Sequence, residues 1–301
     1  MNNFNYKNLS VQLEVFKNHP SFLAGFTDGE GCFTLGLSPS KVQALFQINL
    51  QKGDKALLEN IQKALGVGHI SPMGDSAYKY QVGAIKDLAI IIKYFDSYRL
   101  ITNKWADYLL FKQAVSLIAA KKHLSQEGFK ELLAIKASLN TGLSSRLQEA
   151  YPGIVPFSRP SVDTLIISDP YWLAGFVNAE GCFSIDLRKA SAYKSGYQVR
   201  LRFRISQHIR DHLLMQSLTD YLGCGKIEIY PKGNAVNFSV LKFDDITTKI
   251  IPFFKEYPIV GIKATGFEKF CKAADLISKG QHLSPEGLEK IIQIKSELDE
   301  Y

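Results

Sequence analysis

One twelve-residue stretch occurs twice in this chain and constrains the fold more than any other feature. Residues 22–33 have the sequence FLAGFTDGEGCF, and residues 172–183 have the sequence WLAGFVNAEGCF. Small residues four positions apart share one face of a helix, where a second backbone can approach closely. We therefore expect two short helices that pack against each other. The small residues are Gly25 and Gly29 in the first copy and Gly175 and Ala179 in the second.

Each copy places a glutamate at the expected end of its helix. Gly31 and Gly181 are the expected stops, so Glu30 and Glu180 fall in the last turn. A carboxylate there faces the negative end of the helix dipole, at a cost of roughly 0.3–1 kcal/mol. The repetition of this cost suggests a positive partner such as a divalent metal ion, although two solvated glutamates at frayed helix ends would give the same pattern.

The remainder of the chain repeats in the same order. Residues 46–48 match 203–205, residues 66–68 match 223–225, and Lys104 matches Lys263. Apolar periodicity predicts helix, two strands, helix, two strands and further helices in each half. The fold class is therefore α+β, with two pseudo-symmetric αββαββα halves. The predicted divisions are an N-terminal half at 1–140, a linker with scattered prolines at 141–167, and a C-terminal half at 168–301.

Composition narrows the class of partner. The net charge is +7 and the isoelectric point about 9.0, which favours a polyanion without choosing between DNA, RNA and a membrane surface. The four cysteines form no CxxC pair, which argues against a cysteine metal cluster or a disulfide framework. No apolar run approaches the length of a membrane span, and the first 18 residues lack the apolar core of a signal peptide.

The strands of the second half carry a basic face. Gln198, Arg200, Arg202 and Arg204 alternate with apolar residues, and like charges on one strand face lie roughly 7 Å apart. Arginine can pair with guanine and glutamine with adenine, so this face suits DNA, the alternative being a solvated basic face. The first half is less charged, and Leu45 takes the place of Arg202, so we expect fewer guanine contacts there. The predicted DNA-binding residues are Thr34, Ser38, Gln43, Leu45, Gln47, Lys79, Ser184, Asp186, Arg188, Gln198, Arg200, Arg202, Arg204, Lys226 and Lys232.

The duplicated stretch resembles the signature motif of the LAGLIDADG homing endonucleases, and most closely that of single-chain members encoded in mitochondrial group I introns. The resemblance covers nearly the whole chain. It implies a DNA-binding saddle of antiparallel sheets in a monomer with internal pseudo-twofold symmetry. It also implies a mitochondrial enzyme that makes a site-specific double-strand break in a long, nearly asymmetric DNA target and so promotes intron mobility. No import signal or membrane partner is expected.

The resemblance also implies roles for particular residues. The acidic position that binds a catalytic divalent cation in the family falls on Glu30 and Glu180, with Gly29 and Ala179 beside them. The expected ion is Mg2+, with Mn2+ or Ca2+ able to occupy the same site. The sixth motif position, usually Asp, is Asn178 in the second copy.

Other residues match positions near the family's active site. Lys104 and Lys263 resemble its basic residue, which stabilises phosphate charge or orders water, although either lysine alone could be an ordinary surface cation at a helix start. Gln51 resembles a residue near the water shell, and His208 or its neighbour Gln207 takes that place in the second half.

Two other functions fit parts of the pattern. Some relatives with this motif assist the splicing of their host intron, so intron RNA is a second possible partner; loss of the acidic pair would favour that function, and both acids are present. A DNA-binding protein that has lost cleavage is the other alternative. Asn178 and Ala179 leave that alternative open, whereas the retained Glu180 opposes it.

Overall fold

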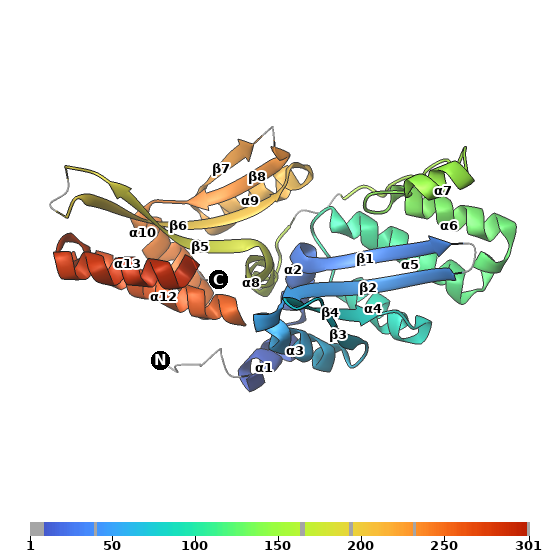
Figure 1. Ribbon diagram of the computed structural model, residues 1–301, viewed down its shortest axis with the longest axis horizontal. Helices are drawn as coiled ribbons and strands as arrows, with labels where there is room; N and C mark the ends of the chain where they lie inside the picture. The colour runs from blue at the N-terminus through green and yellow to red at the C-terminus, as the bar shows by residue number, and fades with distance from the viewer. Residues whose placement is uncertain (1–8, 39–40, 163–165, 193–194, 231–232, 300–301) are drawn as a thin grey trace. The chain divides into compact units, whose positions relative to one another are not determined.

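The computed structural model describes residues 9–38, 41–162, 166–192, 195–230 and 233–299. Within these ranges the chain forms two four-stranded antiparallel sheets with helices packed on them (Figure 1), which confirms the α+β class. The chain divides into two compact units, one made of Met1–Phe26 with Ile166–Tyr301 and the other of Thr27–Leu165. No helix in the described ranges is both long and apolar enough to cross a bilayer.

The unit Thr27–Leu165 holds the first sheet, whose strand order is β1-β2-β4-β3. Its strands are β1 (Gly31–Ser38), β2 (Lys41–Gln51), β3 (His69–Met73) and β4 (Ala77–Val82). Its helices are the end of α2 (Pro20–Glu30), then α3 (Lys55–Leu65), α4 (Ile85–Ser97), α5 (Lys104–Ala119), α6 (Gln126–Ser138) and α7 (Ser145–Ala150).

The other unit holds the second sheet, in the equivalent order β5-β6-β8-β7. Its strands are β5 (Gly181–Lys189), β6 (Tyr197–His208), β7 (Lys226–Tyr230) and β8 (Ala235–Val240). Its helices are α1 (Leu9–Asn18), the start of α2, α8 (Pro170–Glu180), α9 (His212–Leu222), α10 (Phe243–Asp245), α11 (Ile251–Glu256), α12 (Ile262–Ser278) and α13 (Pro285–Asp299). The matching strand orders confirm the predicted repeat.

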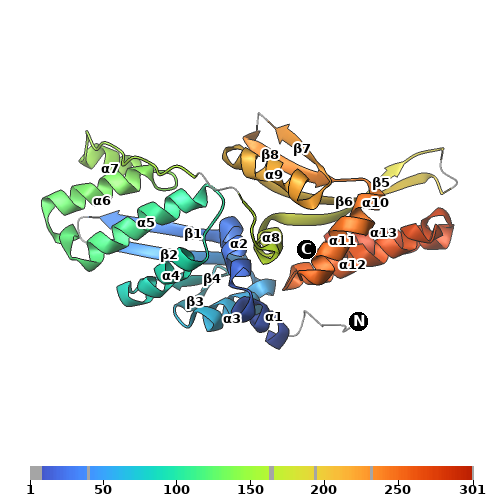
Figure 2. The same cartoon turned by 180° about the vertical axis from the view of Figure 1, so that it is seen from behind.

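Matched aromatic clusters close one face of each sheet. The ring of Phe33 in β1 lies 5.2–5.7 Å from the rings of Phe46, Phe95, Tyr108 and Phe111. Phe183 in β5 lies 5.1–5.7 Å from its own set, Phe203, Phe254, Phe267 and Phe270. The helices α4 and α5 supply this cover in one unit, and α11 and α12 supply it in the other (Figure 2). The opposite face of each sheet stays partly open, as the strand alternation predicted.

The two motif helices pack through their glycines. A Cβ added at Gly25 would lie 1.9 Å from the carbonyl oxygen of Trp172, and one at Gly175 would lie 1.9 Å from that of Phe22. These residues all belong to the same compact unit. The contact is reciprocal, because Phe22 and Trp172 are themselves matched positions of the repeat. The predicted packing of the two copies is therefore confirmed at Gly25 and Gly175.

Glycine also follows each motif helix directly, because there is no space for a side chain. A Cβ at Gly31 would lie 2.4 Å from Cγ2 of Thr27, and a Cβ at Gly181 would lie 2.5 Å from Cγ1 of Val177. Gly181 has φ −77° and ψ 147°, so it enters the next strand directly and does not form a left-handed helix end. The predicted stop is right, and crowding by the preceding turn explains why glycine occupies it.

The segment that follows the first half contains a helix that the sequence did not reveal. Helix α7 has six residues and no buried side chain, so it lacks the apolar periodicity that marks longer helices. Beyond it, Phe157 N–H donates to the carbonyl of Ala134 at 2.9 Å. Arg159 donates to the buried carboxylate of Asp107 at 2.8 Å. The segment is thus fastened to the helices of the Thr27–Leu165 unit, while the predicted domain boundaries stay a prediction.

Candidate active site and nucleic-acid interface

Each motif helix ends on its glutamate. Glu30 is the last residue of α2 and is exposed, and Glu180 is the last residue of α8 and is half-buried. The strand that follows begins at the next residue in both units. Each carboxylate therefore stands at the junction between a motif helix and a sheet.

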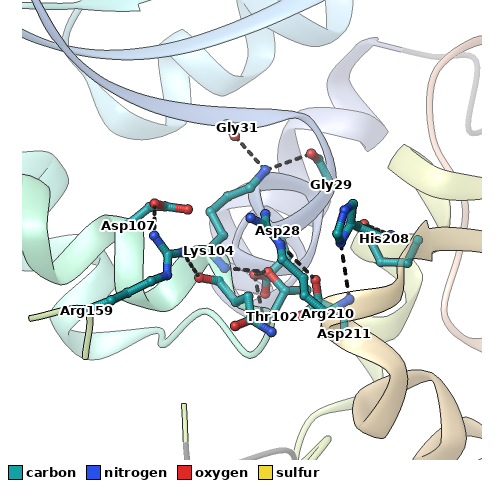
Figure 3. A network of polar contacts seen from close by, with 12 residues as sticks. Asp28, Gly29, Gly31, Thr102, Lys104, Asp107, Arg159, His208, Arg210 and Asp211 are labelled. Carbon is teal, nitrogen blue, oxygen red and sulfur yellow. Dashed lines mark hydrogen bonds and ion pairs between the residues drawn. The ribbon is translucent and has the colours of Figure 1, made fainter. Parts of the chain in front are cut away.

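A lysine meets the end of the first motif helix. Lys104 opens α5, and its Nζ donates to the carbonyls of Gly29 at 2.7 Å and Gly31 at 2.6 Å (Figure 3). It also donates to the carbonyl of Thr27 at 2.9 Å. The last carbonyls of a helix have no partner within the helix, and an ammonium group has three N–H donors to offer. The negative helix end beside Glu30 is thereby matched by a positive charge.

The second unit repeats this contact. Nζ of Lys263, near the start of α12, donates to the carbonyls of Val177 at 3.3 Å, Ala179 at 3.0 Å and Gly181 at 2.8 Å. The three carbonyls occupy the same motif positions as those bound by Lys104. The sequence matched the two lysines, but it could not show that each one gathers the end of its own motif helix.

A buried acid at the sixth motif position ties the first helix to the loop before α5. Asp28 is 2% exposed, and its carboxylate accepts from Ile101 N at 2.8 Å, Thr102 N at 3.2 Å and Thr102 Oγ1 at 2.5 Å. This loop leads directly to Lys104, so Asp28 helps to fix where the lysine starts. Sequence reasoning missed this role; the available signal was an acid between buried positions of an apolar helix.

The second unit keeps the tie with an amide. Oδ1 of Asn178 accepts from Val260 N at 2.7 Å. Gly261 stands where the first unit has Thr102, and its φ of 69° with ψ of −154° is a conformation that glycine favours. Because glycine offers no hydroxyl at this position, the loop has one side-chain donor fewer to satisfy there, and a neutral amide suffices. The departure from Asp at this position therefore preserves the local structure.

The donor groups at the two helix ends suit a hard cation. Each end offers one carboxylate, Glu30 or Glu180, and one adjacent carbonyl, that of Gly29 or Ala179. Those two carbonyls already face a cation, the lysine ammonium, and all-oxygen sets are what Mg2+ and Ca2+ bind. Across the residues that the structure describes, no three His, Cys, Asp or Glu side chains gather as a metal site. Metal binding by these four residues stays a prediction.

The predicted DNA-binding residues of the first unit share the open face of their sheet, opposite Phe33. Thr34 pairs with Leu45 across β1 and β2. Gln47 pairs with Gln81 across β2 and β4, and its Nε2 donates to Oε1 of Gln81 at 2.8 Å. The members of this face named from the sequence are Thr34, Ser38, Gln43, Leu45, Gln47 and Lys79. The hydrogen bond between the two amides is a neutral one.

The second unit presents a face of mixed charge, whereas the sequence predicted a row of crowded like charges. Arg202 Nη2 lies 2.7 Å from Asp186 Oδ2, and Lys226 Nζ lies 2.7 Å from Glu228 Oε1. Glu228 also accepts from Ser239 Oγ at 3.2 Å. Carboxylates thus alternate with the cations. The predicted residues on this face are Ser184, Asp186, Arg188, Gln198, Arg200, Arg202, Arg204 and Lys226, whereas Lys232 lies outside the described residues.

The residues expected near a water shell lie where β2 and β6 end. Gln51 is exposed at the end of β2. In the other unit, Oε1 of Gln207 accepts from His208 N at 2.8 Å, and Nδ1 of His208 accepts from Arg210 N at 3.2 Å (Figure 3). Gln207 and His208 therefore support the turn into α9, and their part in catalysis stays a prediction.

Comparison with known proteins settles the family. The family model described as LAGLIDADG endonuclease matches residues 23–115 and 173–274. The chain belongs to this family. It is 41% identical over 300 residues to "Probable intron-encoded endonuclease 2" of Neurospora crassa, covering 93% of this chain and 65% of that protein. It is 38% identical to "Probable intron-encoded endonuclease 3" of the same organism, covering 95% and 55%. The chain thus spans between about half and two thirds of the length of these curated relatives.

Solved structures of LAGLIDADG proteins match along nearly the whole chain. I-SmaMI bound to an uncleaved DNA target in the presence of calcium ions has a TM-score of 0.91 and 41% identity, covering 93% of this chain and 99% of that one. I-SmaMI bound to cleaved DNA has a TM-score of 0.90 and 41% identity, covering 92% and 95%. The fold of this LAGLIDADG protein is therefore that of the meganucleases, as the resemblance implied.

Proposed function

We propose that this protein is a homing endonuclease that makes a double-strand break at a specific site in DNA. The observation that carries the proposal is the duplicated helix end, a glutamate whose neighbouring carbonyls are gathered by a lysine in each unit. Family membership and the DNA complexes of I-SmaMI support it. The break would promote mobility of the intron that encodes the protein, as the names of its intron-encoded relatives suggest.

The reaction would be hydrolysis of a phosphodiester bond with the help of Mg2+. The ion, when bound, would supply an activated water and offset the charge that develops on the phosphate. Glu30 and Glu180 would hold it, together with the carbonyls of Gly29 and Ala179. Mn2+ or Ca2+ would use the same oxygen donors, and I-SmaMI was solved with calcium ions and uncleaved DNA.

The primary role of Lys104 and Lys263 would be to bind the carbonyls at the ends of the motif helices. Each ammonium donates to three carbonyls, so contact with a phosphate or a water would require it to release at least one of them. Solved variants of I-SmaMI include one in which two lysines 159 positions apart are replaced by alanine, and Lys104 and Lys263 have the same separation. This agreement supports a shared role for the matched lysines near the active site.

The open faces of the two sheets would bind double-stranded DNA, one half-site to each. Their different polar side chains suit an asymmetric target, and one chain with an internal repeat would act as a monomer. The net charge of +7 favours such a polyanionic partner. A mitochondrial location is supported by matching relatives, which include a protein named as mitochondrial and several named as intron-encoded.

A cleavage assay tests the proposal. The full chain is incubated with the allele of its host gene that lacks the intron, with Mg2+, with Ca2+ or with a chelator. We expect one double-strand break in Mg2+, binding without a break in Ca2+, and no cleavage with the chelator. The allele interrupted by the intron serves as control and should remain intact. Binding of the uninterrupted allele with no break at any Mg2+ concentration would contradict the proposed activity.

A further inference from the structure

We infer that Asp186 is a positioning residue that makes Arg202 specific for guanine in the half-site bound by the second unit. The inference rests on the proposed function and concerns how one base position is recognised. The two side chains form an ion pair on the open face of β5 and β6, with 2.7 Å between Arg202 Nη2 and Asp186 Oδ2.

The pair runs diagonally across the two strands. Arg202 is registered opposite Ser184, and Asp186 is registered opposite Arg200. The guanidinium therefore leans along the strand to reach the carboxylate. The two side chains are 27% and 28% exposed, and they line an open hollow of about 340 Å³ along β5, which Lys295 and Asp299 of α13 also line. The pair is thus fixed in place and still reachable by a ligand.

The remaining donors of Arg202 are limited in direction. Its Nε is buried and finds no acceptor among the described residues, and Nη2 already donates to Asp186. An incoming acceptor can therefore approach only at the terminal nitrogens. These form the planar fork that matches the O6 and N7 acceptors of guanine. A guanidinium held in one orientation favours that base over phosphates, which can be approached from many directions.

A second carboxylate, that of Glu228, lies on the same face of the sheet, where it pairs with Lys226. The pKa of Glu228 is lowered, first by its hydrogen bond from Lys226 and also by the charge of Arg202. Asp186 and Glu228 both add negative charge to a face that would meet phosphates, which weakens binding to DNA of any sequence. The two carboxylates are explained if they improve discrimination between DNA sequences. Specificity depends on the difference between the binding free energies of the right and wrong targets, and not on affinity alone.

The first unit has no equivalent of this pair. Its sheet has the same register, with Thr34 opposite Leu45 and Gly36 opposite Gln43. Leu45 therefore stands in the place of Arg202, and Gly36 in the place of Asp186. The inference accordingly predicts a guanine preference of this kind in one half-site and not in the other.

The test compares Asp186→Asn with the unchanged full chain. Binding is measured in Ca2+ against a set of duplexes in which each base pair of the cleaved site is varied in turn. We expect the variant to lose about tenfold of its guanine preference at one position of the second unit's half-site. Affinity for unrelated DNA should hold or rise, since a negative charge has been removed. Asp220→Asn, an exposed acid on α9, is the matched control and should leave the base profile unchanged.

Several outcomes would overturn the inference. One is an Asp186→Asn variant with the full guanine preference at every position. Another is an equal loss of preference in both half-sites, since that would indicate a general loosening of the fold. Arg202→Lys provides a second variant, because it keeps the charge without the fork, and it should lose the same preference at the same position. If the unchanged chain shows no base preference anywhere, the proposed function fails, and the inference fails with it.

Discussion

The two halves of this protein agree where they are buried and differ where they are open. The aromatic clusters around Phe33 and Phe183 use matched positions, and Lys104 and Lys263 gather matched carbonyls. On the open faces, one sheet has an amide pair, Gln47 with Gln81, and the other has ion pairs built on carboxylates. Packing restrains the buried residues, because a core tolerates few changes of volume. Exposed strand residues are free of that restraint and can diverge.

The largest expected effect is at the glycine contact between the motif helices, a feature to which both halves contribute in the same way. Gly25→Ala and Gly175→Ala should each lower the free energy of unfolding by about 3 kcal/mol, because the added methyl would collide with a backbone carbonyl. Urea denaturation measures this. Gly266→Ala in α12 is the control; among the described residues its Cβ would meet only Leu298 Cδ2, at 3.5 Å, and it should raise stability by about 0.5–1 kcal/mol. Wild-type stability in either motif variant would refute the close approach.

Removing the lysine contacts should have the next largest effect. Lys104→Met leaves three carbonyls at a helix end without their charged donor and should cost about 2 kcal/mol. Lys263→Met should cost somewhat less, because its three distances are each longer. Denaturant titration compares both with Lys63→Met, an exposed lysine of α3 whose loss should change stability by less than about 0.5 kcal/mol. Loss of activity with unchanged stability would instead point to a purely catalytic lysine.

The two halves also differ at the sixth motif position, which is Asp28 in one and Asn178 in the other, and exchanging these residues tests that difference. Asp28→Asn should cost about 1–2 kcal/mol, since an amide oxygen cannot accept all three donors from Ile101 and Thr102. Asn178→Asp should also destabilise, by about 1 kcal/mol, because it buries a charge opposite the neutral backbone donor of Val260. Thermal unfolding of the two variants checks this. A gain of stability from Asn178→Asp would mean that the second loop has spare donors.

The smallest expected effect is a difference in how the stability of the fold depends on pH. The hydrogen bond from Lys226 lowers the pKa of Glu228 below its usual value of 4.5. A carboxyl lowered in this way stabilises the fold above its unfolded pKa, and the contribution is lost as the pH falls through the folded pKa. Between about pH 5 and 3 the wild type should therefore lose stability that Glu228→Gln does not lose. Gln81→Ala on the other open face removes no titrating group and should leave that slope unchanged; equal slopes in all three proteins would contradict the assignment.

The sequence predicted most of the scaffold because its signals are local. Strand alternation and helical periodicity located the elements. The repeat added the equivalence of the two halves. Helix α7 escaped notice because it buries no side chain. The grouping of α1 and the start of α2 with residues 166–301 depends on contacts between distant segments, which no local pattern records.

The candidate site was predictable in its residues and not in its contacts. Glu30, Glu180, Lys104 and Lys263 follow from the repeat and the family resemblance. The targets of the lysine ammonium groups do not, because they lie more than seventy residues away along the chain. The diagonal pairing of Arg202 with Asp186 depends on strand register and side-chain direction. Counting the charges along β6 alone gave a more uniformly basic face than the sheet presents.

The most direct test of the account is strand-resolved cleavage by Glu30→Gln and Glu180→Gln on the intronless target in Mg2+. If each helix end supplies one acid to the reaction, either variant should lose double-strand cleavage by about a thousandfold or more and still bind the same site. Glu127→Gln, an exposed acid of α6, should cut at the normal rate. Double-strand cleavage at the normal rate by either motif variant would contradict the account.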